Sequence, residues 1–170
     1  LGTGLGITGA GTNFAYDVEV AANGDVFATI DGSIHKSTNA GVTFAAAMTL
    51  PIAVGRVELS CAPNDANYVY AICENANVVA GILRTTNGGT TWTSRTEPAD
   101  ADTGIPNTDC SRGQAWYDLS IAVDPNNRDR LFVGGVDIFV SGDGAGTWTA
   151  PTRPVPARAL WPASAPDPRS

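Results

Sequence analysis

The sequence predicts an all-β fold built from three similar units of short antiparallel strands. The chain of 170 residues contains 19 glycines and 11 prolines, a density that interrupts long helices. Between these turn residues lie short runs rich in β-branched and aromatic side chains, which are typical of strands. The pattern of runs recurs three times along the chain. An internal repeat therefore organises the molecule.

Each repeat ends in an eight-residue turn segment, which we call an octet. The octets span residues 37–44, 85–92 and 141–148, so they begin 48 and 56 residues apart. Three strands are expected before each octet and a fourth can follow it. Four-stranded antiparallel units that repeat at roughly this spacing are typical of β-propeller blades. Strands that are apolar on both faces, such as Tyr68–Ile72, fit a sheet covered on both sides.

The expected fold is a partial β-propeller of about three four-stranded antiparallel blades. The blades are expected at about residues 14–50, 55–97 and 115–150, within one unit covering residues 1–150. Closed propellers have typically 4–8 blades. We therefore expect the chain to belong to a larger propeller, completed by further sequence or by other copies. The remaining residues, 151–170, hold six prolines and three arginines, and we expect an extended or disordered tail there.

The octets have residue types that close a tight turn. Their third residue is Asn39, Asn87 or Asp143, whose side chain can accept hydrogen bonds from backbone N–H groups further along. A metal-binding or catalytic role is disfavoured, because two of these three side chains are neutral amides and hard cations prefer carboxylates. The residues expected to have a structural role are Ser37, Asn39, Gly41, Thr43, Phe44, Thr85, Asn87, Gly89, Thr91, Trp92, Ser141, Asp143, Thr147 and Trp148.

The octets resemble the Asp-box, or BNR repeat, with the pattern Ser-x-Asp-x-Gly-x-Thr-Trp. The third copy keeps the serine, aspartate, threonine and tryptophan but has Ala145 where glycine is expected. The first two copies have asparagine for aspartate, the first ends in Phe44, and the second begins with Thr85. The resemblance implies a propeller of the sialidase, xyloglucanase and sortilin-like group. It also implies that the octets lie on the outer rim, away from the functional face.

Candidate ligand-binding residues gather around the longest irregular stretch, residues 97–114. A guanidinium, an amide and two aromatic rings form a mixture that suits sugars, since rings stack on them and planar polar groups bond their hydroxyls. The alternative is that the rings pack at the end of a blade and that Asp118 caps a strand. The ligand-binding candidates are Arg56, Arg112, Gln114, Trp116 and Tyr117.

Catalysis by the chain stays an open question at the level of sequence. Glycosidases use two carboxylates about 5–10 Å apart. Asp17 and Asp118 are the candidates, because we expect them at equivalent positions of different blades, with Arg56 at that position between them. The single histidine, His35, is expected to pack and not to act as a base. No zinc spacing or phosphate loop is present, so neither metal nor cofactor is expected.

The three cysteines and the overall charge bear on location and partners. If the protein is exported, a Cys73–Cys110 disulfide is expected, with Cys61 a buried free thiol. A formal charge of −7 disfavours nucleic acid, and no apolar run approaches the roughly 20 residues of a membrane span. We expect a secreted or surface protein of bacteria, since the lysine content is low, with any signal sequence removed or lying outside this piece of the protein.

Three function classes follow from these features. The leading hypothesis is a fragment of a secreted bacterial Asp-box propeller that serves as a glycan- or protein-binding scaffold. The first alternative is a fragment of a glycoside hydrolase of sialidase or xyloglucanase type. The second alternative is a sortilin-like propeller that binds peptides. In each case the expected partners are a glycan or protein ligand and the remaining blades.

Overall fold

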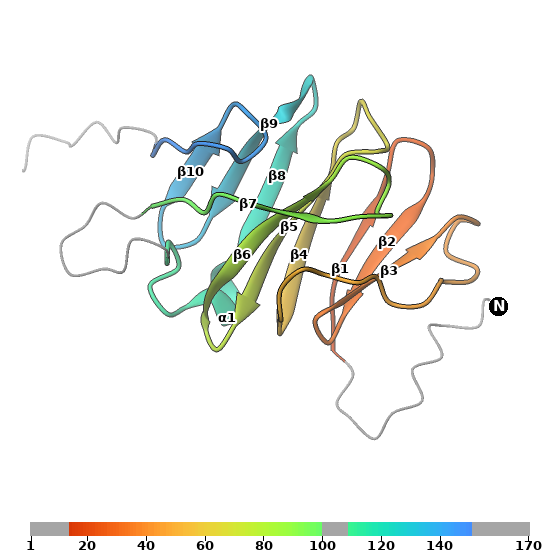
Figure 1. Cartoon of the computed structure of the whole chain (residues 1–170), viewed down its shortest axis with the longest axis horizontal. Coiled ribbons are helices and arrows are strands. Elements are labelled where there is room, and N and C mark those ends of the chain that lie inside the picture. The colour runs from red at the N-terminus through yellow and green to blue at the C-terminus, as the bar shows by residue number, and fades with distance from the viewer. Residues whose placement is uncertain (1–13, 100–108, 151–170) are drawn as a thin grey trace, which may run out of the picture.

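Three antiparallel sheets follow one another along the chain in the computed structural model, which describes residues 14–99 and 109–150. Figure 1 shows them in chain order, from the red and orange strands to the blue ones. The first sheet contains β1 (Ala15–Val20), β2 (Val26–Ile30) and β3 (Ser33–Ser37). The middle sheet contains β4 (Arg56–Cys61), β5 (Val69–Asn75), β6 (Val78–Thr85) and β7 (Thr93–Arg95). The third sheet contains β8 (Ser120–Asp124), β9 (Asn127–Gly134) and β10 (Ile138–Ser141).

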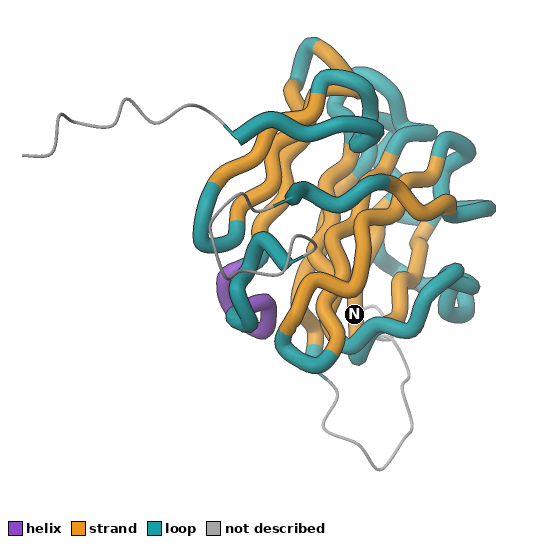
Figure 2. Tube along the Cα trace, turned by 60° about the vertical axis from the view of Figure 1, so that its left-hand side comes forward, coloured by secondary structure: helices purple, strands orange, loops and turns teal. Residues whose placement is uncertain are grey.

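Helix is almost absent from the described residues, as the expected fold class requires. The one helix there is α1 (Ala115–Asp118), the short purple turn in Figure 2. Tight turns join neighbouring strands. Between β5 and β6, Ala76 and Asn77 have φ angles of 55° and 72°, and between β2 and β3, Asp31 and Gly32 have φ angles of 45° and 74°. Two consecutive positive φ angles suit the right-handed twist of a hairpin. No helix of the described residues is long and apolar enough to cross a bilayer.

The fourth strand of each blade is regular only in the middle sheet. In the first sheet, two isolated backbone bonds replace it, from Ala45 N to the Lys36 carbonyl and from Met48 N to the Ile34 carbonyl, both 2.8 Å. In the third sheet, Thr149 forms a single bridge with Val140. Three sheets of antiparallel strands in sequence order confirm the all-β fold class. The four-strand pattern is complete in one sheet of the three.

The strand registers give the structural equivalence of residues between the sheets. The octet residues Ser37, Thr85 and Ser141 pair with Val26, Val69 and Leu131, and these three pair in turn with Val20, Cys61 and Val123. Counting back from Val20, Cys61 and Val123 along the first strand of each sheet, Asp17 is equivalent to Glu58 and Ser120. By the same count, Arg56 is equivalent to Asp118.

The expected equivalence of Asp17 with Arg56 and Asp118 is therefore wrong by two residues. Side chains alternate between the faces of a strand with a period of two. A slip of two residues consequently keeps every apolar side chain on its own face, and the hydrophobic pattern of the sequence does not reveal it.

The sheets pack face against face around two hydrophobic clusters. We call the face that the middle or third sheet turns to the preceding sheet its leading face, and the opposite face its trailing face. In the first sheet the leading face is the one that carries the equivalent residues by strand register. Phe27 and Ile34 on the trailing face of the first sheet pack with Leu59, Val69 and Ala71 of the middle sheet. The second cluster joins the trailing face of the middle sheet to the leading face of the third, through Tyr70, Ile72, Ile82, Val123, Leu131, Val133 and Phe139.

The three octets are closed by the same hydrogen bonds. The hydroxyl of the first residue accepts a bond from the backbone N–H of the fifth, and the side chain of the third accepts one from the seventh. The first kind joins Gly41 to Ser37, Gly89 to Thr85 and Ala145 to Ser141, each at 2.9 Å. The second kind joins Thr43 to Asn39 and Thr91 to Asn87 at 2.9 Å, and Thr147 to Asp143 at 2.8 Å.

All three cysteines are free and buried, so the expected Cys73–Cys110 disulfide is not formed. Cys73 belongs to the cluster between the first and middle sheets, whereas Cys110 belongs to the cluster between the middle and third sheets. The middle sheet thus separates the two sulfurs. Burial raises the pKa of each of the three thiols to about 12, which keeps them protonated and unreactive at neutral pH. The tail, residues 151–170, lies outside the described residues.

Candidate functional site

The loop before α1 is organised by the buried carboxylate of Asp109. Its Oδ2 accepts a hydrogen bond from Gly113 N at 2.7 Å, and its Oδ1 accepts bonds from the backbone and hydroxyl of Ser111. Oδ1 also accepts a long bond of 3.4 Å from Val79 N on β6. A short acidic side chain that bonds backbone groups two and four residues on closes a local turn. Asp109 therefore fixes the loop to the middle sheet.

α1 presents two aromatic side chains to solvent. Trp116 and Tyr117 are 60% and 52% exposed, and their ring centroids lie 4.5 Å apart with an interplanar angle of 66°. The Tyr117 hydroxyl donates a hydrogen bond to Oε1 of Gln114. Ala115 attaches the helix to the middle sheet. It is fully buried, and its N–H donates a hydrogen bond to the carbonyl of Asn77 in the β5–β6 turn. The sequence-predicted Gln114, Trp116 and Tyr117 thus form one surface patch.

The two arginines predicted to bind ligand are held by protein groups. Arg56 pairs with Glu58 at 2.7 Å, and its Nη1 donates to the carbonyl of Ala115 at 3.3 Å. Arg112 pairs with Asp137 of the β9–β10 connection at 3.0 Å. Both side chains are mostly buried, so they link α1 and its loop to the middle and third sheets. Arg56 thus contacts the helix that carries the aromatic pair.

Asp118 lies at the end of α1 with one buried oxygen unused. Within the described part of the chain, its Oδ1 is shielded from solvent and has no hydrogen-bond partner. Burial raises the pKa of Asp118, and the charge of Asp109 adds to this, while Arg56 opposes it. Burial likewise raises the pKa of Glu97, with a further contribution from Asp109. The surroundings of Asp118 therefore disfavour its charged form relative to a solvent-exposed aspartate.

Asp17, the other catalytic candidate, connects two sheets. Its Oδ2 accepts a hydrogen bond of 2.7 Å from Leu59 N on β4, and its Oδ1 accepts one of the same length from Val18 N. Two residues further along β1, Glu19 has a raised pKa because of burial and the charge of Asp17, opposed by the N–H of Cys61. Both carboxylates thus accept hydrogen bonds from backbone N–H groups on the free edge of β4. The third sheet repeats this contact, since Val123 N donates to Ser60 Oγ at 3.1 Å.

The sequence interpretation missed two features of this region. It gave Asp109 no role, although the spacing Asp109, Ser111, Gly113 is typical of a side chain that closes its own turn. It also missed Glu58, which pairs with Arg56 and has a pKa raised by burial. For Glu58 the available signal was its spacing of two residues from Arg56, which places both side chains on one face of β4. No group of three potential metal-binding side chains occurs in the part of the chain that the structure describes.

Solved structures provide the comparison that decides the fold. YCF48 from Cyanidioschyzon merolae superposes with a TM-score of 0.59 at 13% identity, over 85% of this chain and 38% of that one. YCF48 bound to a D1 peptide superposes with a TM-score of 0.55 at 16% identity, over 83% and 42%. The GH74 xyloglucanase from Xanthomonas campestris gives 0.52 at 21% identity, over 81% and 20%.

These neighbours are β-propeller proteins. The chain is part of a β-propeller. It spans about two fifths or less of the length of each of these neighbours, and its three antiparallel sheets match part of that fold. At this level of identity the comparison establishes the fold alone. The sequence matches no protein-family model and no curated protein.

Proposed function

We propose that the chain is a segment of a secreted bacterial Asp-box propeller that serves as a ligand-binding scaffold, and that α1 and the preceding loop contact a glycan. The observation that carries the proposal is the exposed pair Trp116 and Tyr117 on a rigidly anchored helix. Exposed aromatic rings with polar groups beside them suit a sugar, whose apolar face stacks on a ring while its hydroxyls bond planar groups. Gln114 and Asp118 supply such groups here.

The rest of the proposal has separate support. The shared hydrogen bonds of the octets support the Asp-box assignment, since a hydroxyl and an Asp or Asn side chain close each turn in the same way. The low lysine content supports secretion. A protein ligand is the alternative within the scaffold hypothesis, including the peptide ligand of a sortilin-like propeller. It is favoured by the similarity to YCF48, one structure of which is bound to a D1 peptide.

A glycoside hydrolase is the second candidate, and Asp118 favours it. A general acid needs a carboxyl group with a raised pKa, and Asp118 has one, with an oxygen free of partners among the described residues. Asp17 is a poor second carboxylate, because both of its oxygens accept backbone hydrogen bonds. The similarity to a GH74 xyloglucanase supports this candidate at the level of the fold.

One experiment separates the candidates. The chain is titrated with xyloglucan oligosaccharides and screened on a glycan array, and sugar release is measured in parallel. Trp116→Ala should weaken glycan binding at least about tenfold, as expected for an aromatic anchor. Val42→Ala, an exposed change in the first octet, should leave binding unchanged. Glycan binding that survives Trp116→Ala contradicts the proposal, whereas sugar release that disappears in Asp118→Asn supports the hydrolase.

A further inference from the structure

The leading face of the first sheet has the composition of a buried blade interface, yet it is exposed. By strand register, Val18 and Val20 are equivalent to Leu59 and Cys61 of the middle sheet. The latter two are buried against the first sheet, with Leu59 only 2% exposed. Val18 and Val20 are 64% and 63% exposed. Residues that are apolar at the same positions in every sheet are thus covered in two sheets and uncovered in one.

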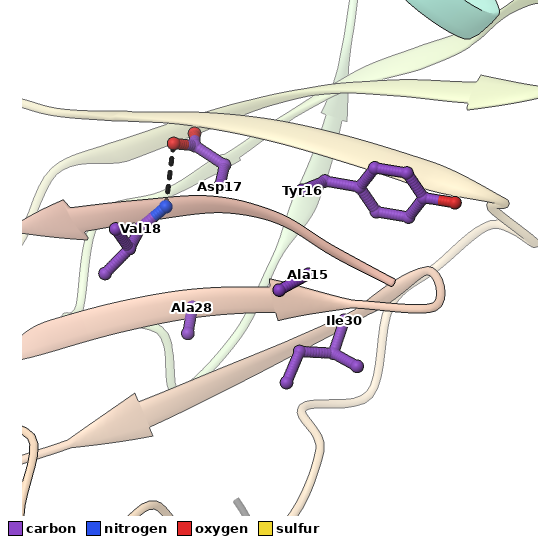
Figure 3. Close-up of a pocket in the computed structure, with 6 residues that line it drawn as sticks. All are labelled: Ala15, Tyr16, Asp17, Val18, Ala28 and Ile30. Atoms are coloured by element: carbon purple, nitrogen blue, oxygen red, sulfur yellow. Dashed lines mark hydrogen bonds between the residues drawn. The ribbon is translucent and has the colours of Figure 1, made fainter. Parts of the chain in front are cut away.

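A shallow open hollow lies on this part of the first sheet. It has a volume of about 350 Å³ and is lined by Ala15, Tyr16, Asp17, Val18, Ala28 and Ile30. Figure 3 shows Asp17 turned toward β4, whereas Val18, Ala28 and Ile30 point to the opposite side of β1 and β2. The equivalents of Ala28 and Ile30 are Ala71 and Cys73, which pack against the first sheet. The hollow therefore lies where a neighbouring sheet fills the equivalent space in the middle of the molecule.

The trailing face of the third sheet carries the complementary residues. At one position of the second strand, all three sheets have an aromatic residue, namely Phe27, Tyr70 and Phe132. The first two are fully buried against the next sheet, and a Cβ at Gly89 of that sheet's octet would lie 3.1 Å from the Phe27 ring. Phe132 is only half-buried and Ile138 is 59% exposed, although its equivalents Ile34 and Ile82 are fully buried.

We propose that the leading face of the first sheet docks the trailing face of the third sheet of a second copy of this chain. Both interfaces inside the chain join a trailing face to a leading face in the same register, so the two outer faces are the separated halves of a third such interface. The contact is head to tail, because two leading faces would bring together no aromatic ring of the Phe27 type. Head-to-tail contacts produce closed rings or open assemblies. The inference rests on the propeller segment of the proposed function but needs no glycan. Further blades of a longer chain would occupy the same two faces, and a chain that stays monomeric at all concentrations would favour that occupant over a second copy.

The test uses one substitution on each face. Val18→Glu places a charge on the leading face, and Ile138→Glu places one on the trailing face. Both side chains are exposed in the single chain, so folding should persist, which circular dichroism checks. Val20→Glu replaces Val18→Glu if that variant does not fold. In sedimentation velocity, the unchanged chain should associate as its concentration rises, and each variant alone should remain a monomer. Val42→Glu, at an exposed valine of the first octet, should associate like the unchanged chain.

Mixing the two variants is the decisive measurement. Each variant retains the face that the other has lost, so an equimolar mixture should form a one-to-one complex that grows no further. A mixture that stays monomeric, single variants that still associate, or an unchanged chain that is monomeric at all concentrations would each overturn the proposal. Trp116→Ala should associate normally, since Trp116 lies on α1. Its effect on glycan binding alone therefore tests the proposed function separately.

Discussion

The first and middle sheets share one strand pattern but differ in what covers them. The middle sheet is packed on both faces, and six of the seven residues of β5 are buried. The first sheet is packed on its trailing face only, and alternate residues of β1 are exposed. Burial of apolar area contributes roughly 25 cal/mol per Å². Equivalent side chains in the two sheets therefore contribute very different amounts to stability, although the sequence patterns look alike.

The difference shows that the stability of a sheet depends on the apolar area it buries against the neighbouring sheets. Contacts within repeat proteins are mainly between adjacent units, and terminal repeats with one neighbour are the least stabilised. The same holds for polar groups. Asp17 and Glu19 of the first sheet accept hydrogen bonds from the free backbone edge of β4, whereas no side chain of a preceding sheet does this for β1 among the described residues. The first sheet is thus the unit whose properties depend most on a further partner.

The largest expected effect compares a covered apolar residue with an uncovered one. Ile72→Ala should lower the free energy of unfolding by about 2–5 kcal/mol, because the fully buried Ile72 leaves a cavity between the middle and third sheets. Val18→Ala should cost less than about 0.5 kcal/mol in dilute solution, as for most exposed positions. Urea unfolding followed by circular dichroism measures both. Equal costs for the two variants would mean that the first sheet is covered in the isolated chain.

A second effect separates the octets of the same two sheets. Gly41 and Gly89 have φ angles of 80° and 91°, so alanine at either site should cost about 1 kcal/mol for the left-handed backbone. A Cβ at Gly41 meets open space, whereas one at Gly89 would lie 2.6 Å from Cε of Met48 and must displace it. The end of the Met48 side chain is flexible and can move aside, so Gly89→Ala should cost only about 1 kcal/mol more than Gly41→Ala.

Thermal unfolding of the two octet variants provides the measurement. The third octet sets the reference, since Ala145 occupies the equivalent position with φ of 63° and is tolerated there. If the two alanine variants lose the same stability, Phe27 and Met48 do not contact Gly89 as closely as the structure shows. A larger loss for Gly41→Ala would place a covering element over the first octet.

The fold was predictable from sequence because its signals are local. Strand alternation and the residue types of the octets depend on neighbours a few positions away, and the three sheets follow from them. The pairing of Cys73 with Cys110 failed because Cys110 lies in a loop, whose side relative to the middle sheet is fixed by distant contacts such as those of Asp109 with β6. The equivalence of Asp17 with Asp118 failed because a shift of two residues leaves the facial pattern intact.

The candidate site was predictable as a set of residues but not as a geometry. Composition singled out Arg112, Gln114, Trp116 and Tyr117, and the structure places them in one loop and helix. Their division of labour depends on contacts that are far away in sequence, such as those of Arg56 with Ala115 and of Arg112 with Asp137. These contacts hold the arginines inside the scaffold and leave the rings outside. Sequence alone offers no means of ranking buried against exposed members of such a cluster.

The smallest expected effect distinguishes the charged third octet from the neutral ones. Hydrogen bonds from the backbone and hydroxyl of Thr147, from the hydroxyl of Ser141 and from Gly146 N hold the pKa of Asp143 well below its usual value of 3.8. A folded-state pKa below the unfolded one gives stability that is present above about pH 4 and lost as the pH falls toward the folded-state pKa. Asn39 and Asn87 close their turns without a charge, so Asp143→Asn should keep the turn and remove this pH dependence.

Melting temperatures measured between pH 7 and pH 2 test this difference. The unchanged chain should lose stability more steeply below pH 4 than Asp143→Asn does. Asn87→Asp provides the matched reverse change, because it introduces a carboxylate that accepts the same hydrogen bond from Thr91 N, and it should steepen the acid loss. Parallel curves for all three proteins would mean that the Asp143 carboxylate gains nothing from its turn. The octets would then be held closed by their first residue, whose hydroxyl bond is the same length in all three copies.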